Sequence, residues 1–190
     1  MKWCLSELFS VLALLAISGV SHAQEGGGIC LLQAAGLGGG FSADQVIDDC
    51  GNGLTSGRLS RMGIVECYDV RASAYMQKRQ YDLAIGDLNE AITLDPNYAR
   101  GWGDRGAAYF AKRNFSAALA DFSHALGIDR KYMGEYERSH HTIDIATIYA
   151  LRGKTYAVLN DTRHAAEDYR SSLALDPGNM VATQGLEQLR

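Results

Sequence analysis

The residues best suited to bind a metal ion lie close together in one short segment, EYERSHHTID at residues 135–144. Histidine and carboxylate side chains are common ligands of zinc. Adjacent histidines on a helix point about 100° apart, so His140 and His141 would not chelate one ion together. His140 and Asp144 share a helix face at the i, i+4 spacing. We favour a solvated insert that binds no metal, and a surface metal site at His140/Asp144 is the alternative.

Cysteines are the second source of chemistry. Apart from Cys4 in the apolar N-terminal segment, the chain has Cys30, Cys50 and Cys67, and no two of them form a CxxC pair. A thioredoxin-like redox motif is therefore absent. In an oxidising compartment, three cysteines permit one disulfide and one free thiol, or a disulfide between two chains. Burial of Cys50 as a small hydrophobic side chain is an equally good interpretation.

Catalytic and nucleotide-binding motifs are missing. The sequence contains no Gly-x-Ser-x-Gly, His-Glu-x-x-His, phosphate-loop or dinucleotide-binding pattern. The glycine-rich residues 24–41, QEGGGICLLQAAGLGGGF, are not a phosphate loop, because no Gly-Lys-Ser/Thr follows them. Glycine is costly to order, so this segment is predicted to be a flexible linker. We expect a protein that is not an enzyme and holds no cofactor or metal.

The overall composition is that of a globular domain, with 47% hydrophobic and 21% charged residues. The formal net charge is −4. Nucleic-acid binding requires a basic face that can neutralise phosphates. The charge balance therefore disfavours a DNA or RNA partner.

The first 23 residues differ in composition from the rest of the chain. Lys2 precedes an apolar run at residues 8–17, and Ser21 and Ala23 occupy the −3 and −1 positions before Gln24. This is the pattern of a secretory signal peptide at residues 1–23. The run is shorter than the roughly 20 residues that span a bilayer. We predict an exported protein, periplasmic or secreted, without stable membrane insertion after cleavage.

From Ser42 onward, helical runs alternate with short polar breaks, and no run has sustained period-two alternation. Such a pattern predicts an all-α fold. Ser42 is followed three residues later by Gln45, the arrangement of a capping box. The first helix is therefore expected to begin immediately after Ser42.

Two similar helix exits, LDPNY at residues 94–98 and LDPGN at residues 175–179, indicate an internal repeat. With Val65 as position 1 of a 34-residue unit, positions 4, 8, 11, 20, 24 and 27 read aromatic, small, aromatic, small, bulky, small in three copies. The copies are Tyr68, Ala72, Tyr75, Ala84, Leu88, Ala91; Trp102, Gly106, Tyr109, Ala118, Phe122, Ala125; and Tyr149, Gly153, Tyr156, Ala165, Tyr169, Ser172. Small residues let two helices approach closely, and bulky ones fill the gaps between hairpins.

This pattern resembles the tetratricopeptide-repeat family, in which helix hairpins of 34 residues stack into an array. The resemblance implies an antiparallel helix-hairpin array that forms a right-handed superhelix. Its parts are a partial repeat at 42–64, repeats at 65–98, 99–132 and 146–179, an insert at 133–145 and a capping helix at 180–190. The insert accounts for the spacing from Pro96 to Pro177, which is two periods plus 13 residues.

The chain departs from the family pattern at a few positions. Arg130 replaces the proline at position 32 of the second repeat, so the second helix of that repeat is expected to run on. Arg79, Arg113 and Asn160 replace the usual glycine at the turn within each repeat. None of these changes alters the packing pattern.

Family members usually bind ligands in a concave groove lined by the first helix of each repeat. The resemblance places there Glu66, Asp69, Ser73, Met76, Arg100, Asp104, Phe110, Thr147, Leu151 and Lys154. Chaperone-binding members carry a carboxylate clamp of lysine, asparagine and arginine, and the corresponding residues here are Asp69, Ser73, Asp104, Thr147 and Leu151. Two acidic residues would repel a peptide carboxylate. A mixed or basic peptide fits better, and an acidic solvated helix face is the alternative.

The partial repeat also suggests a disulfide. Val46, Cys50 and Gly53 have the 20–24–27 spacing of a second helix. This places Cys50 against the helix that holds Cys67. Cys50–Cys67 is the preferred pairing, and Cys30–Cys50 is the alternative.

Together these features predict a non-catalytic adaptor or scaffold of the cell envelope that binds an unknown protein or peptide through the groove. One alternative is a metal- or redox-linked envelope protein that uses His140/Asp144 or an unpaired cysteine. Another is a self-assembling structural module, which would form a homo-oligomer.

Overall fold

The computed structural model describes residues 41–132 and 145–190, with side chains from Asp129 to Tyr132 left out. These ranges contain eight helices and no strand, so the all-α prediction is confirmed. The helices are α3 (Ala43–Thr55), α4 (Arg61–Gln77), α5 (Tyr81–Leu94), α6 (Ala99–Ala111), α7 (Phe115–Tyr132), α8 (Ile145–Val158), α9 (Thr162–Leu175) and α10 (Met180–Gln188). The predicted signal peptide, the linker up to residue 40 and the insert up to residue 144 lie outside the described residues.

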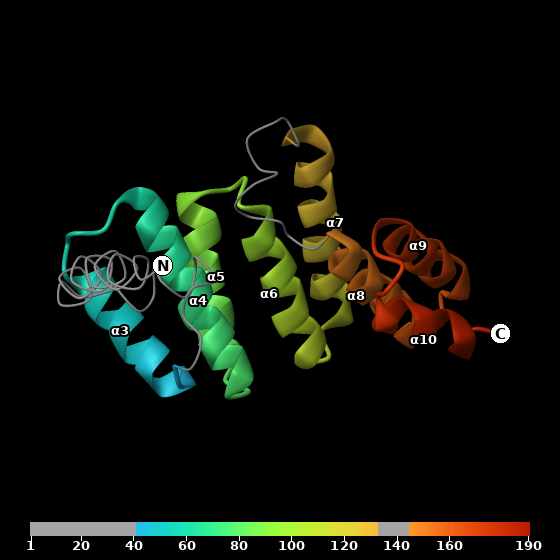
Figure 1. The fold of residues 1–190 in the computed structure, drawn as a ribbon, viewed down its shortest axis with the longest axis horizontal. Coiled ribbons are helices and arrows are strands. Elements are labelled where there is room, and N and C mark those ends of the chain that lie inside the picture. The colour runs from blue at the N-terminus through green and yellow to red at the C-terminus, as the bar shows by residue number, and fades with distance from the viewer. Residues whose placement is uncertain (1–40, 133–144) are drawn as a thin grey trace, which may run out of the picture.

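The helices form an elongated array in which each helix packs against the next (Figure 1). The hairpins α4–α5, α6–α7 and α8–α9 are the three repeats. α4 also contacts α6, and α6 contacts α8, whereas among the described helices α5 does not contact α7 and α7 does not contact α9. The first helices of the repeats therefore lie on the inner side of a curved array. Their exposed surface is the concave face of the molecule.

Small residues allow the two helices of each hairpin to approach closely, as the sequence predicts. Ala84, Ala118 and Ala165, at position 20 of the three repeats, are fully buried. A Cβ atom added to Gly106 would lie 2.8 Å from the Phe122 ring. At this distance the ring or a helix would have to move. The repeat pattern therefore records packing between helices.

Ser172 occupies position 27 of the third repeat, where the other repeats have Ala91 and Ala125. All three residues are fully buried. The Ser172 hydroxyl has no hydrogen-bond partner among the described residues. A buried polar group without a partner is destabilising.

We expect Ser172→Ala to raise the free energy of unfolding by about 1 kcal/mol, because it removes this unpaired hydroxyl. Chemical denaturation monitored by circular dichroism measures the change. The matched substitution Ala91→Ser should lower stability by a similar amount. A loss of stability in Ser172→Ala would show that the hydroxyl has a favourable interaction.

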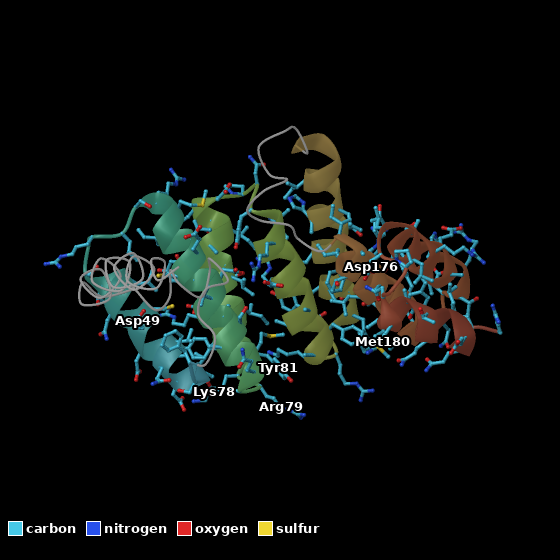
Figure 2. The ribbon with its side chains drawn as sticks, viewed as in Figure 1. Asp49, Lys78, Arg79, Tyr81, Asp176 and Met180 are labelled. Atoms are coloured by element: carbon cyan, nitrogen blue, oxygen red, sulfur yellow. The ribbon has the colours of Figure 1, made fainter. Side chains whose placement is uncertain are left out.

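The turn inside each repeat uses a left-handed backbone conformation without glycine. Arg79, Arg113 and Asn160 have φ angles of 59°, 61° and 62°. Each lies between two helices of one hairpin, and Figure 2 shows Arg79 beside Lys78 and Tyr81 at the end of the first hairpin. Residues with a Cβ atom pay about 1–2 kcal/mol for this conformation, with asparagine the best tolerated. The family's preference for glycine here has this physical cause.

We therefore expect Arg79→Gly and Arg113→Gly each to stabilise the protein by about 0.5–1 kcal/mol. The relief of strain exceeds the entropy that glycine adds to the unfolded chain. Asn160→Gly should change stability less, because asparagine already tolerates the left-handed region. Thermal unfolding of the three variants measures whether the gain in stability is larger at Arg79 and Arg113 than at Asn160. Equal effects at all three sites would argue against backbone strain as the cause.

Helix α3 behaves as the second helix of a preceding repeat. The Ser42 hydroxyl accepts a hydrogen bond from the Gln45 backbone at 3.2 Å, and the Gln45 side chain accepts one from the Ser42 backbone at 2.8 Å. The predicted capping box is confirmed. Lys78 in the first repeat forms an ion pair with Asp44, and Lys112 forms one with Asp82 at the same positions one repeat later.

The predicted Cys50–Cys67 disulfide is wrong. Cys50 is disulfide-bonded, but Cys67 is a free thiol, so the partner of Cys50 lies outside the described residues. Cys67 is fully buried and packs with Val46 and Val70 in an apolar cluster. Burial, followed by the nearby acidic residue Asp49, raises the pKa of the Cys67 thiol to about 12. Cys67 serves as a small apolar side chain. The Cys30–Cys50 pairing stays a prediction.

The segment between the second and third repeats differs slightly from its predicted bounds. α7 has 18 residues, whereas α5 and α9 have 14 each. The second helix of this repeat thus runs on to Tyr132, as the missing proline at position 32 predicts. Ile145 is the first residue of α8, so the insert ends one residue earlier than predicted.

Helix α10 closes the C-terminal end of the array. The Asn179 side chain accepts a hydrogen bond from the Ala182 backbone at 3.1 Å and caps the helix. Ala182 and Gly185 face the third repeat and are buried. Among the described helices, none is long and apolar enough to cross a bilayer.

Candidate functional site

Each repeat contains a buried ion pair that holds its two helices together. The arginine at position 7 of the first helix donates two hydrogen bonds to the aspartate at position 23 of the second. The Nε–Oδ2 and Nη2–Oδ1 distances are 2.7–2.8 Å in all three pairs. The pairs are Arg71–Asp87, Arg105–Asp121 and Arg152–Asp168. Such bidentate, charge-assisted pairs fix the geometry of the hairpin.

Aromatic residues at positions 4 and 11 lie beside these arginines. The guanidinium carbon of Arg105 lies 4.7 Å from the ring centre of Trp102 and 5.9 Å from that of Tyr109. The guanidinium carbon of Arg152 lies 5.7 Å from the ring centre of Tyr149 and 6.0 Å from that of Tyr156. Cation–π contacts at these distances are attractive. The aromatic positions of the repeat thus pack against the arginine as well as filling the gap between hairpins.

The same arginines also join successive repeats. Arg105 Nη1 donates to Asn89 Oδ1 at 2.7 Å, and Arg152 Nη1 donates to Ser123 Oγ at 3.2 Å. Asn89 stands at position 25 of the first repeat, and Ser123 stands at position 25 of the second. We missed this network from the sequence, although its signal was present as an arginine and an aspartate 16 residues apart in every repeat. The network positions the first helices and is not itself a binding surface.

A compact charged cluster lies on the concave face and is formed by Asp69 on α4 and by Arg100 and Asp104 on α6. Arg100 Nε lies 3.2 Å from Asp69 Oδ2 and 3.5 Å from Asp104 Oδ2. Asp69 has 2% of its side chain exposed, whereas Arg100 and Asp104 have 40% and 41% exposed. The resemblance places all three residues in the groove. The structure brings them together, with Asp69 beneath the other two.

The surrounding protein strongly affects the acidity of this cluster. Withdrawal from bulk water, followed by the nearby carboxylate of Asp69, raises the pKa of Asp104 to about 7. The Arg100 guanidinium opposes this shift. Burial and the same Asp69 carboxylate also raise the pKa of the Tyr98 hydroxyl. Asp104 therefore changes its charge near neutral pH, far above the usual range of an aspartate.

This shift predicts a pH-dependent contribution to stability. The folded protein binds a proton at Asp104 between about pH 7 and pH 4, where the unfolded chain does not. The contribution of Asp104 to the free energy of unfolding should therefore rise as the pH falls through this range and be lost above it. Asp104→Asn should be more stable than the parent protein at pH 8 and lose that advantage at pH 5. Urea denaturation at both pH values measures the two stabilities. If the difference in stability between Asp104→Asn and the parent protein is the same at pH 8 and pH 5, the pKa of Asp104 is not raised.

A pocket of about 190 Å³ adjoins the charged cluster. Its lining residues are Phe41, Ala43, Val46, Val70, Ser73, Ala74, Gln77 and Arg100. Arg100 therefore borders both the pocket and the acidic pair. The N-terminal end of the concave face thus offers an indentation lined by both polar and apolar groups beside the charged cluster.

The other predicted groove residues occupy different places on the same helices. Lys154 Nζ lies 5.6 Å from the ring centre of Phe110 on the preceding repeat. Met76 and Leu151 are half-buried against core clusters, which limits their contact with a ligand. Glu66, Ser73 and Thr147 are half-buried. The predicted surface is thus only partly accessible, and its charged part lies at Asp69, Arg100 and Asp104.

The described residues give no support to the metal-linked and redox-linked alternatives. His140 and Asp144 lie outside the described residues. Within the described ranges, no group of three or more histidine, cysteine or acidic side chains could hold a metal ion. Cys67 is buried, and its raised pKa keeps the thiol protonated.

Three stacked helix hairpins have their first helices on the concave side, and a capping helix closes the end. This arrangement defines a helical repeat protein. Family models match two parts of the chain. A TPR repeat model matches residues 72–113, and a tetratricopeptide repeat model matches residues 146–179. These two matches show that the chain contains tetratricopeptide repeats. No curated protein matches it in sequence.

Several solved structures share this fold. The TPR domain of Arabidopsis OM64 is 27% identical, with a TM-score of 0.59 over 69% of this chain and 98% of that domain. The first TPR of Spaghetti (RPAP3), bound to the HSP90 peptide SRMEEVD, is 25% identical, with a TM-score of 0.56 over 66% of this chain and 89% of that one. MamA is 21% identical, with a TM-score of 0.62 over 77% of this chain and 76% of that one, and shows similarity of fold alone.

Proposed function

We propose that the protein is a non-catalytic adaptor that binds a peptide segment of a partner protein on its concave face. The observation that carries this proposal is the arrangement of α4, α6 and α8. These helices contact one another in sequence along the inner side of the array. The Arg–Asp pairs hold each of them to its outer helix, so the surface is rigid before a ligand arrives.

The similar structures support binding of a peptide by this fold. The first TPR of Spaghetti (RPAP3) holds SRMEEVD, a peptide with three acidic residues. The present chain has Asp69 and Asp104 on its concave face, and these side chains disfavour such a peptide when both are ionised. We therefore propose a partner segment that is not acidic.

Site-specific photo-crosslinking tests the adaptor function. A benzoylphenylalanine residue replaces Ser73 or Thr147 on the concave face, and Glu90, exposed on the outer helix α5, is the matched control position. Irradiation in an extract of the source cells should give an adduct from the concave positions that is missing from the Glu90 position. Mass spectrometry identifies the captured protein, and a titration with its purified form gives the affinity. If the adducts are the same from both faces, the concave face is not the binding site.

We further propose that the adaptor works after export, in the periplasm or outside the cell. The support is the apolar run at residues 8–17 and the small residues Ser21 and Ala23 at the cleavage positions. N-terminal sequencing of the mature protein from its source should begin at Gln24. A mature chain that still begins at Met1, recovered from the cell interior, would disprove export.

A further inference from the structure

A pocket of about 310 Å³ lies between the outer helix α9 and the capping helix α10, which contact each other at the C-terminal end of the array (Figure 1). It is separate from the concave face, which α4, α6 and α8 form. Its lining contains three arginines and no acidic side chain. The lining includes Arg163, Ala166 and Arg170 of α9, Leu186 of α10, and Leu189 and Arg190 directly after α10. The pocket therefore brings positive charge and apolar groups together in a chain whose formal net charge is −4.

The three repeats provide an internal comparison for this pocket. On the second helix of each repeat, positions 18, 21 and 25 lie along one face of the helix. They read Asp82, Ile85, Asn89 in the first repeat, Ser116, Leu119, Ser123 in the second, and Arg163, Ala166, Arg170 in the third. The third repeat thus has alanine in place of a large apolar residue, with a cation on each side of it. The packing of the fold does not require this change, because the other two repeats form the same hairpin without it.

Arg170 stands where the first two repeats have a hydrogen-bond acceptor. Their position-25 side chains, Asn89 and Ser123, each accept a hydrogen bond from the position-7 arginine of the next repeat. After the third repeat, position 7 is occupied by Leu186, which has nothing to donate or accept. Among the described residues, Arg170 has no hydrogen-bond or ion-pair partner. The end of the array therefore presents a guanidinium that the repeat network does not use.

Arg163, the second cation on this face of α9, is held by an exposed ion pair. Its Nη1 lies 3.1 Å from Oε1 of Glu167, one turn later on the same helix, and the two side chains are 69% and 52% exposed. Its Nη2 lies 2.6 Å from Nε2 of His164. Exposed pairs of this kind contribute little to stability. Arg163 can therefore exchange Glu167 for the carboxylate of a ligand at small cost.

We propose that the α9–α10 pocket binds an acidic segment of a partner protein. Carboxylates of the segment pair with Arg163 and Arg170, and an apolar side chain between them enters the space that Ala166 leaves beside Leu186. Charge selects this occupant, because arginine binds carboxylates through parallel hydrogen bonds and no acidic side chain of the lining competes. The inference goes beyond the proposed function, since the concave face disfavours an acidic segment and this pocket favours one.

Titration with short peptides tests the pocket. The probe is acetyl-Glu-Glu-Leu-Glu-Glu-amide, and the neutral control is acetyl-Gln-Gln-Leu-Gln-Gln-amide. In amide NMR spectra of the folded protein, the acidic probe should shift the resonances of residues 163–170 and 186–190 in a saturable manner, and the neutral control should not. Replacing the leucine of the probe by serine should weaken binding, because less apolar surface is buried. Binding should also weaken as the salt concentration rises.

Residues taken from the other repeats supply the variants. Ala166→Leu introduces the residue of the second repeat, fills the pocket and should weaken binding of the acidic probe by about tenfold. Arg170→Asn introduces the residue of the first repeat, removes one ion pair and should weaken binding by about threefold. Arg58→Asn, at an exposed arginine before α4, changes the net charge equally and should leave binding unchanged. Circular dichroism confirms that each variant is folded.

The proposal is overturned if the acidic and neutral peptides give the same shifts, or if Ala166→Leu binds the acidic probe as well as the parent protein does. Equal losses of binding in Arg58→Asn and Arg170→Asn would also overturn it, because the attraction would then come from net charge alone. The photo-crosslinking experiment is independent of these results. Capture from the concave positions without a response to the acidic probe would leave the adaptor function intact and remove only the α9–α10 site.

A second copy of the chain is the competing occupant of this pocket. Sedimentation of the parent protein and of Arg170→Asn separates the two cases. A parent protein that sediments as a monomer while it binds the acidic probe supports a partner segment. A parent dimer that dissociates in Arg170→Asn would show that the pocket joins two copies and would overturn the proposal.

Discussion

Asp121→Ala is expected to lower the free energy of unfolding by about 3 kcal/mol. Asp121 receives two hydrogen bonds of 2.8 Å from Arg105, and the two side chains are only 7% and 16% exposed. Alanine would leave the guanidinium buried between two aromatic rings without its counter-charge. A buried charge that loses its partner costs more than the pair contributes when it is intact.

A double-mutant cycle separates these two quantities. The single variants of the cycle are Arg105→Met and Asp121→Leu, and the double variant combines them, which replaces the whole pair by apolar groups of similar size. Each single change should be strongly destabilising, whereas the double variant should recover much of the loss. Urea denaturation under non-reducing conditions, which preserve the Cys50 disulfide, measures all four proteins.

The matched control is an exposed ion pair of the same array. Asp82 pairs with Lys112, but 83% of its side chain is exposed. Asp82→Ala should change the free energy of unfolding by no more than about 0.5 kcal/mol. If Asp82→Ala and Asp121→Ala destabilise the protein equally, burial is not what makes the position 7–23 pair important.

The packing of the repeats could be predicted from the sequence because the pattern is itself a record of packing. Positions 8, 20 and 27 hold small residues where helices touch, and Phe122 at position 24 is fully buried. Each contact involves residues within one hairpin or the next, so the 34-residue period is sufficient to place them. The start of a helix could be predicted as well, because it depends on residues that are close together in the sequence, as the Ser42 capping box shows.

The charged network could not be predicted in the same way. Charged residues on a helix are usually solvated, and nothing in the type of Arg105 or Asp121 shows that they are buried together. Only their recurrence in three repeats could have revealed them. Asp69 shows a related limit, because its repeat position places it in the groove but does not show that residues of the next hairpin cover it. The pairing of Cys50 also depends on a segment that the repeat pattern does not include.

The second large effect is expected at the C-terminal end of the array. Gly185 in α10 packs directly against Tyr169 of the third repeat, and a Cβ atom added there would lie 2.2 Å from the tyrosine ring. The ring is almost fully buried and cannot easily move. Gly185→Ala should therefore displace α10 and lower the free energy of unfolding by about 2–3 kcal/mol.

Gly86→Ala is the control that makes this prediction specific. Gly86 lies in helix α5, is exposed, and has no atom within 4 Å of an added Cβ. There, alanine should stabilise the protein by about 0.5–1 kcal/mol through its higher helix propensity. The same chemical change thus has opposite signs at the two sites. Hydrogen exchange should show α10 opening in Gly185→Ala while α4 and α5 stay protected, which would establish α10 as the cap of the array. A stabilising Gly185→Ala would show that the Tyr169 ring or α10 moves without cost to make room for the methyl group.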